Sequence, residues 1–300
     1  MVNSTNRQLI KYAAAGLGGL AVLYAGLSAL GARFSMEIPR VPVKGSPGDV
    51  GLAYEEVAFP SRDGAVRLRG WFLPGEKNRA ILIVHGGDEN RVDDNVATLP
   101  LVRDLVAKGY AILTFDLRGR GESEGKGLSL SNIGPDIGGA VDCLAGRGYP
   151  PEKVGILGFC SGAASACIYT SRNPVGVLIL DGCFIDVPTM VVREAASARL
   201  PECLVRVFLP GLRLMTRVLY GYRVVDPIDV VGDIACPILF IHEEYDEFIT
   251  LEETRRLYEA SANPADETWE VEGALHSQSY RTVPERFISR VDEFISKNLG

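Results

Sequence analysis

The stretch Val154-Gly-Ile-Leu-Gly158-Phe-Cys160-Ser-Gly162-Ala-Ala-Ser-Ala166 decides the fold of this chain. A short apolar run, a glycine-flanked turn and a run of small residues predict a strand, a sharp turn and a helix. The turn reads G-x-C-x-G, which is the spacing of a nucleophile elbow with cysteine in the place of the usual serine. The positions two before and two after the nucleophile must be nearly free of side chain, because strand and helix approach closely there.

This steric requirement selects Cys160 over Ser161 as the candidate nucleophile. Gly158 and Gly162 flank Cys160, whereas the bulky Phe159 stands two positions before Ser161. At the N-terminus of the following helix, free N–H groups and the helix dipole favour a thiolate. The N–H of Ser161 faces the same space and is a candidate oxyanion donor. The alternative is that Cys160 is a small, unreactive buried residue in a turn.

Composition describes a globular chain without a basic surface. Of its 300 residues 47% are hydrophobic and 23% are charged, which fits one large α/β domain. The net charge of -7 makes nucleic acid an unexpected partner. The scattered cysteines contain no C-x-x-C pair, so neither a disulfide framework nor a zinc site is expected; they are Cys143, Cys160, Cys167, Cys183, Cys203 and Cys236.

The N-terminal region contains a charge-free run, residues 12–30, that is long enough to cross a membrane as a helix. We predict a short tail at 1–11, a single-pass membrane anchor at 12–30 and a linker at 31–51. A retained anchor is favoured over a cleaved signal peptide, because the run is longer than a usual signal core. A buried soluble helix fits less well, since the run is apolar on all faces. Basic residues flank both ends, so the orientation is left open: Arg7, Lys11, Arg33, Arg40 and Lys44.

From residue 52 to residue 300 the pattern predicts one α/β domain. A hairpin at 54–59 and 66–73 precedes apolar runs typical of buried parallel strands, and helical patterns alternate with these runs. We therefore expect a mostly parallel sheet with helices on both faces and ligands beyond the strands' carboxyl ends. The expected strands are 80–84, 110–115, 154–157, 176–180, 238–241 and 267–271, and the expected helices are 94–108, 135–145, 162–171, 251–260 and 284–298.

One segment, residues 186–231, is about twice as long as an ordinary crossover and shows no clear strand. We interpret it as a helical cap inserted over the site. Arg206, Arg213 and Arg217 are spaced through its apolar centre, which suits contact with lipid or with a lipophilic substrate. An ordinary amphipathic cap packed on the core is the alternative.

A thiolate nucleophile needs a base, and the chain has only three histidines. His276 follows the expected last strand, so its imidazole would reach the sheet edge where Cys160 lies, and it is the predicted base. His85 precedes Gly86-Gly87 in a loop that would shape an oxyanion hole, and His242 is interpreted as structural.

The predicted acid is Asp246, which lies just beyond another strand and would orient the base. Its spacing favours it over three nearby carboxylates, Glu243, Glu244 and Glu247.

From about residue 54 to the C-terminus the chain resembles an α/β-hydrolase. The resemblance rests on the His85-Gly86-Gly87 loop, the elbow, Asp246, His276 and a D-x-R-G-x-G-x-S segment at 116–123. It implies that the second oxyanion N–H belongs to Gly87 or Asp88. A cysteine nucleophile is a departure that is similar to dienelactone hydrolases, polyester synthases and bile-acid acyltransferases.

A second departure is Glu243 after His242, where many members have glycine; we expect it to add negative charge beside the triad. These features predict a hydrolase of ester, thioester, lactone or similar acyl bonds, an amide included, through a Cys160–His276–Asp246 triad. An acyltransferase and a catalytically silent binding protein are the alternatives. No metal or organic cofactor is implied. The expected partners are a small acyl substrate, lipophilic ones included, and the membrane; substrate identity, orientation and oligomeric state are left open.

Overall fold

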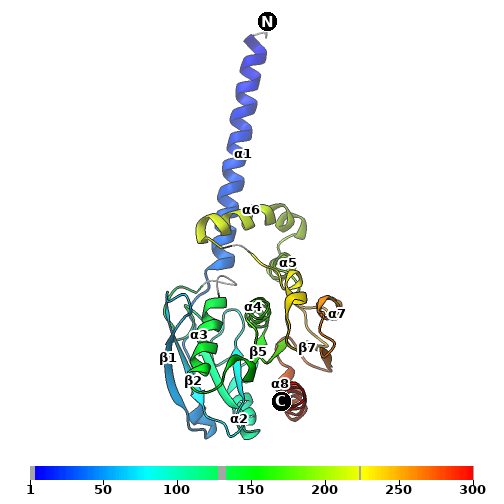
Figure 1. Ribbon diagram of the computed structural model, residues 1–300. Helices are drawn as coiled ribbons and strands as arrows, with labels where there is room; N and C mark the ends of the chain where they lie inside the picture. The colour runs from blue at the N-terminus through cyan, green and yellow to red at the C-terminus, as the bar shows by residue number, and fades with distance from the viewer. Residues whose placement is uncertain (1–3, 128–132, 223, 300) are drawn as a thin grey trace.

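The computed structural model describes residues 4–127, 133–222 and 224–299, and a twisted sheet lies at its centre (Figure 1). In these residues the sheet has eight strands in the order β1-β2-β4-β3-β5-β6-β7-β8. The first two form an antiparallel hairpin, β2 pairs antiparallel with β4, and all later pairs are parallel. The strands are β1 Glu55–Pro60, β2 Arg67–Leu73, β3 Ala80–Val84, β4 Ala111–Asp116, β5 Val154–Phe159, β6 Val177–Asp181, β7 Ile238–Glu243 and β8 Glu267–Val271.

Helices cover both faces of the sheet, which explains why the central strands are apolar along their whole length. One core layer joins the sheet to α3, α4 and α7, and the other joins it to α2 and α9. The predicted α/β fold with a mostly parallel sheet is therefore confirmed. The helices are α2 Thr98–Ala107, α3 Gly134–Ala145, α4 Ser161–Thr170, α7 Leu251–Ala260, α8 Ser279–Thr282 and α9 Pro284–Asn298, with 3-10 turns η1 Pro47–Val50, η2 Pro151–Lys153, η3 Pro227–Asp229 and η4 Val231–Asp233.

Within the α/β domain most predicted boundaries agree with the structure within two residues, and α2 is the exception. It begins at Thr98, four residues later than predicted from the apolar pattern. The Asp93 carboxylate accepts hydrogen bonds from the N–H groups of Asn95 and Val96 (2.8 and 3.3 Å), and Ala97 has a φ of 58°. Local side-chain bonding thus holds these residues in turns rather than in helix.

The segment between β6 and β7 contains two helices, α5 Val187–Ser197 and α6 Glu202–Tyr220. Asp186 caps α5 by accepting a hydrogen bond from the N–H of Thr189 (2.7 Å). From α5, Arg193 forms an ion pair with Glu253 of α7 and donates to the backbone oxygen of Phe248. These contacts hold the insertion, which we call the cap, over the end of the sheet.

The N-terminal helix α1, Ser4–Met36, projects away from the domain (Figure 1). Its part from Lys11 to Met36 has a mean hydropathy of 1.7, and only 6% of its most apolar window is buried. By length and composition it is able to cross a membrane, and its exposure distinguishes it from a buried core helix. The helix extends beyond the predicted span 12–30 at both ends, so the first residues of the predicted linker are helical.

Candidate active site

Cys160 lies in a strained turn between β5 and α4. Its φ of 51° and ψ of -120° are unusual for a residue with a side chain, and its N–H bonds to the backbone oxygen of Asp181 (2.9 Å). At the two flanking glycines the backbone passes so close that a methyl group would not fit. A Cβ on Gly158 would lie 2.7 Å from Cα of Ala163, and one on Gly162 would lie 2.3 Å from the backbone oxygen of His85. The first close approach is between strand and helix, as expected; the second is to the end of β3.

His276 and Asp246 meet at the carboxyl edge of the sheet, beside Cys160. The Nδ1 atom of His276 lies 2.7 Å from Oδ2 of Asp246, and the N–H groups of Phe248 and Ile249 bond to the other carboxylate oxygen. Burial lowers the pKa of His276, but hydrogen bonds with Asp246 and Cys160 and their negative charge outweigh it and raise the pKa to about 10. The imidazolium form is therefore stabilised next to the sulfur.

The loop after β3 runs alongside the nucleophile. A Cβ on Gly86 would lie 3.3 Å from Cβ of Cys160, and one on Gly87 would lie 3.6 Å from Oγ of Ser161. Among the described residues, the N–H groups of Gly87, Asp88 and Ser161 have no acceptor. The loop that carries Gly87 and Asp88 thus passes beside Ser161, and these predicted oxyanion donors have no recorded protein acceptor in the described part of the chain.

Arg120 supports this loop with a hydrogen bond, a role that the sequence did not indicate. It is 2% exposed, and its Nε donates a 2.8 Å hydrogen bond to the backbone oxygen of Gly87. Burial lowers the pKa of Arg120 to about 10. The D-x-R-G-x-G-x-S segment therefore contacts the site through the residue between its two glycines.

The other two histidines are structural. Nδ1 of His85 lies 2.8 Å from the oxygen of Gly86, and Nε2 accepts a hydrogen bond from the N–H of Leu117 (3.1 Å). Burial lowers the pKa of His85 to about 3, so the ring is neutral and ties β3 to the end of β4. His242 faces Thr254 on α7, and burial lowers its pKa as well.

Behind His276 lies a buried carboxyl pair, Asp181 and Glu243, both 0% exposed. Glu243 accepts a hydrogen bond from the N–H of Ser277 (2.7 Å), and Ser279 donates one to Asp181 (3.0 Å). Burial and the partner's negative charge raise the pKa of Glu243 well above its usual range, and burial raises the pKa of Asp181 too. The expectation that Glu243 itself adds negative charge is therefore wrong, because burial beside a second carboxyl favours its neutral form.

Asp181 was missed by the sequence reasoning, although a signal existed. It follows an apolar strand directly, as Asp116 does, and the strand-end position that supported Asp246 applies to it equally. Nothing in the local pattern shows that β6 and β7 are neighbours, and only their pairing brings Asp181 next to Glu243.

The only cluster of possible metal ligands found among the described residues consists of Glu243, Asp246 and His276, with one atom of each within 4.8 Å of the others. Hydrogen bonds account for this closeness, because Asp246 binds the His276 ring and Glu243 binds the backbone of Ser277. The donor set fits an acid–base pair better than an open metal site.

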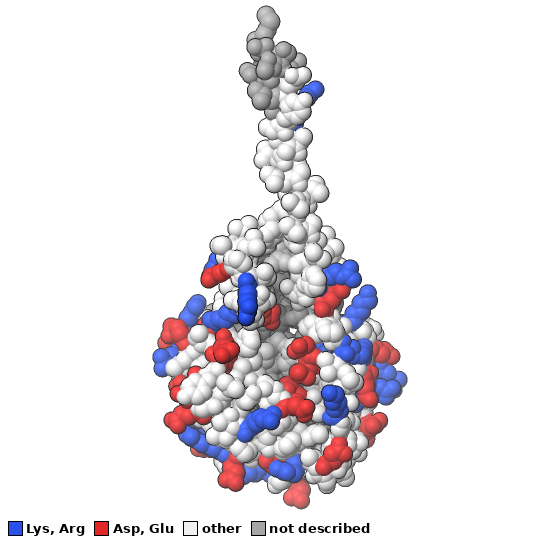
Figure 2. Space-filling model, turned by 180° about the vertical axis from the view of Figure 1, so that it is seen from behind, with Lys and Arg blue, Asp and Glu red and all other residues white. Residues whose placement is uncertain are grey.

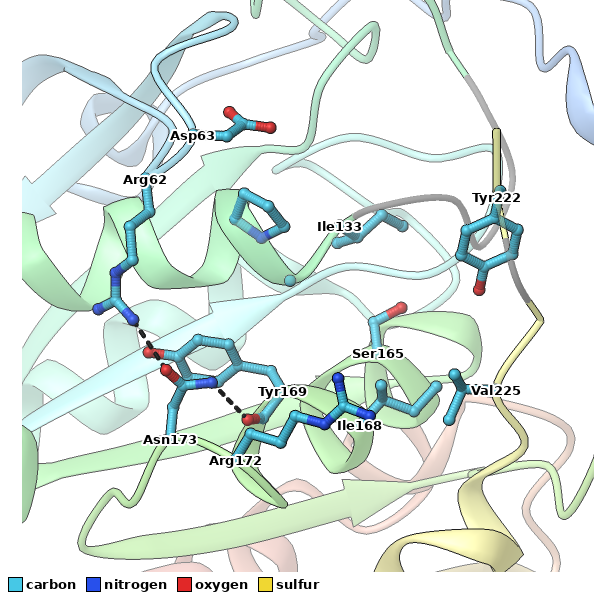
Figure 3. Close-up of a pocket in the computed structure, with 12 residues that line it drawn as sticks. Arg62, Asp63, Ile133, Ser165, Ile168, Tyr169, Arg172, Asn173, Tyr222 and Val225 are labelled. Carbon is cyan, nitrogen blue, oxygen red and sulfur yellow. Dashed lines mark hydrogen bonds between the residues drawn. The ribbon is translucent and has the colours of Figure 1, made fainter. Parts of the chain in front are cut away.

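A separate cavity lies along α4 (Figure 3). Ser165 and Tyr169 of the helix line it, Arg62 lies toward one end, and Tyr222 and Val225 of the cap lie toward the other. None of the triad residues lines it. It is therefore distinct from the candidate active site.

Comparison with known proteins decides the family. The family model described as serine aminopeptidase, S33, matches residues 75–227, just over half of the chain. The chain belongs to this family of α/β-hydrolases. The predicted resemblance is thereby confirmed, and the chain is a hydrolase by family.

Individual relatives agree with this placement. The α/β-hydrolase is 29% identical over 303 residues to the α/β-hydrolase domain-containing protein WAV2 of Arabidopsis thaliana, covering 94% of this chain and 93% of WAV2. It is 27% identical to the lysophosphatidylserine lipase ABHD12 of Danio rerio, covering 71% of this chain and 56% of that protein. Its structure matches the esterase Pf2001 of Pyrococcus furiosus with a TM-score of 0.74 at 25% identity, covering 88% of this chain and 99% of the esterase.

Proposed function

We propose that this α/β-hydrolase cleaves ester, thioester or lactone bonds through Cys160, His276 and Asp246, at the surface of a membrane that α1 crosses. One observation carries the proposal: a cysteine in the strained elbow lies beside a histidine whose other nitrogen is bonded to a buried aspartate. This is the arrangement of nucleophile, base and orienting acid that acyl transfer needs.

The proposed reaction starts from an imidazolium at His276, which its raised pKa favours, and from a thiolate at Cys160, which the positive ring and the N-terminus of α4 would stabilise. The sulfur of Cys160 attacks the carbonyl carbon, and the carbonyl oxygen becomes an oxyanion that accepts hydrogen bonds from Ser161 and the Gly87–Asp88 loop. When the oxyanion collapses, the leaving group departs and takes the proton from His276. The products of this half-reaction are an acyl-thioester on Cys160 and a neutral imidazole.

Water then completes the reaction. Neutral His276 removes a proton from the water as it attacks the thioester carbon, and collapse of the second oxyanion releases the acid and restores the thiolate and imidazolium. An alcohol or amine in the place of water would make the same intermediate an acyltransferase. Asp246 holds the ring in one orientation through its bond to Nδ1.

An apolar cavity between the cap and the base of α1 supports a lipophilic acyl substrate. It has a volume of about 60 Å³ and is lined mainly by apolar side chains of α1, α5 and α6, among them Met36, Met190 and Leu209. Glu194 also lines it, and burial, together with the negative charge of Asp88, raises the pKa of Glu194. As with the cavity along α4, none of the triad residues lines it.

The test combines mechanism probes with three substitutions in the elbow and one control. Cys160→Ala should lower turnover by about three orders of magnitude or more, as removal of a triad nucleophile does. Ser161→Ala should change it little, because only the backbone N–H of that residue takes part, and the exposed Cys203→Ala serves as the matched control. Cys160→Ser should retain weak esterase activity.

Mass spectrometry after incubation with ester, thioester and lactone probes separates the alternatives. An acyl group on Cys160 that water removes supports the hydrolase, and transfer to an added alcohol supports the acyltransferase. An acyl group trapped on Ser161, or full activity of Cys160→Ala, would overturn the assignment. Absence of any adduct with all three probes would favour a silent binding protein.

A further inference from the structure

The cap helix α6 lies across α1 and packs against it at one level along the axis of α1 (Figure 1). The hydroxyl of Tyr24 donates to the backbone oxygen of Val207 (2.9 Å) and accepts from the N–H of Gly211 (3.2 Å). It thus bridges two groups that would bond directly in a regular helix, next to Pro210, which has no N–H. The ring of Tyr24 also stacks on Phe208 at 5.0 Å.

Close packing continues from Tyr24 toward the base of α1. A Cβ on Gly211 would lie 2.1 Å from Oγ of Ser28, and one on Gly31 would lie 2.7 Å from Cδ2 of Leu212. Glycine on each helix lets the two backbones approach, so α6 is fixed at the level of residues 24–31 of α1. Any depth that α1 has in a bilayer therefore sets the depth of α6.

The free part of α1 is too short to cross a bilayer alone. From Tyr12 to Tyr24 an α-helix rises about 18 Å, whereas the hydrocarbon core is about 30 Å thick. The charge-free run 12–30 as a whole rises about 27 Å, which is close to the required length. The last third of that run is the part in contact with α6.

The exposed surface of α6 suits this position. Its apolar residues recur at helical spacing along one face, and each of three arginines directly precedes one of them, which puts the basic groups on the adjoining face. Figure 2 shows an uncharged neck between the basic group near the outer end of α1 and the cap, where charged side chains begin. The apolar residues are Leu204, Val207, Leu214 and Val218, between 49% and 66% exposed, and the arginines are Arg206, Arg213 and Arg217.

We propose that α6 is embedded in the membrane, with its apolar face at the boundary between headgroups and acyl chains of the bilayer that α1 crosses. The proposal rests on the anchoring proposed above and adds that anchor and cap enter the bilayer as one unit. Helices of this composition bury their apolar face about 5–10 Å deep, which supplies a large part of the about 12 Å by which the free part of α1 falls short of the hydrocarbon core. The cap contacts the loop after Asp246, because Arg193 donates to the backbone oxygen of Phe248, whose ring lies against His276. The cap would then face the lipid directly.

The experiment measures quenching of tryptophan by brominated lipids, with the full-length protein in phosphatidylcholine–phosphatidylglycerol vesicles. Leu214→Trp reports on α6, Leu20→Trp reports on the middle of the anchor, and Tyr258→Trp, exposed on α7, is the matched control. Emission of the unsubstituted protein is subtracted to remove the native Trp71 and Trp269. Bromine is placed near the headgroup end or near the methyl end of the acyl chain.

We expect lipid brominated near the headgroup to quench the added emission of Leu214→Trp to about the same extent as it quenches the added emission of Leu20→Trp. Leu20→Trp should respond more strongly to bromine near the methyl end, and Tyr258→Trp should respond to neither lipid. Quenching of Leu20→Trp without quenching of Leu214→Trp would overturn the embedding of α6 and leave the anchor intact. If neither is quenched, the anchor itself is refuted and the embedding with it.

Discussion

Substituting alanine for Gly162 tests whether close backbone approach at the elbow positions the chemistry. The added Cβ would lie 2.3 Å from the backbone oxygen of His85, 2.5 Å from that of Val84 and 2.9 Å from the carbonyl carbon of His85. Ordinary contacts of a Cβ begin near 3.4 Å, so the nearest is more than an ångström too short. All three atoms are backbone, so no rotamer change relieves the clash.

The displaced group is the end of β3, which leads directly into Gly86 and Gly87. Overpacking of a well-filled site costs about 1–3 kcal/mol, and the upper part of that range is expected where backbone must move. A shift of about 1 Å in a catalytic group lowers the rate by about 100-fold. Gly162→Ala should therefore lose about 2–3 kcal/mol of unfolding free energy and about 100-fold in kcat/KM.

Urea unfolding and hydrolysis of a chromogenic ester measure the two effects. Gly134→Ala is the control, because a Cβ at the first residue of α3 meets nothing within 4 Å. That variant should match the parent in activity and be equal or slightly higher in stability. Parental stability and turnover in Gly162→Ala would refute the argument that this glycine is required by the approach of β3.

The remaining predictions concern proton positions. In the proposed ion pair the imidazolium of His276, whose pKa is raised to about 10, holds the sulfur of Cys160 as a thiolate, so alkylation of Cys160 by iodoacetamide should be nearly constant between about pH 7 and 9; in His276→Ala it should rise steeply with pH, and a steep rise in the parent would contradict the ion pair. Burial raises the pKa of Asp181 to about 6 and that of Glu243 further, so the stability from their bound proton is full below about pH 4 and is lost as pH rises through 6 and above. Glu243→Gln, which stays neutral, should therefore gain unfolding free energy relative to the parent between pH 5 and 9 in urea titrations, and a constant difference would show that Glu243 does not hold the proton.

The sequence by itself determined the order of the elements. Apolar runs without polar interruption are consistent with strands covered on both faces, and the spacing Gly158-x-Cys160-x-Gly162 is short-range, so both can be read without knowing the fold. His276 was found because few histidines exist and because a loop after a parallel strand must lie at the sheet's carboxyl edge. The length and apolar character of residues 12–30 likewise needed no tertiary information.

Tertiary structure alone decided what depends on which segments become neighbours. The pairing of β6 with β7 buries Asp181 beside Glu243, and this burial favours the neutral form of Glu243. Arg120 supports the oxyanion loop only because β3 and β4 lie side by side. The hydroxyl of Tyr24 hydrogen-bonds to backbone groups of α6 that lie some 180 positions further along the chain. No local pattern encodes this contact. Local propensity and periodicity act over a few residues, whereas burial, proton sharing and helix docking are set by the assembled fold.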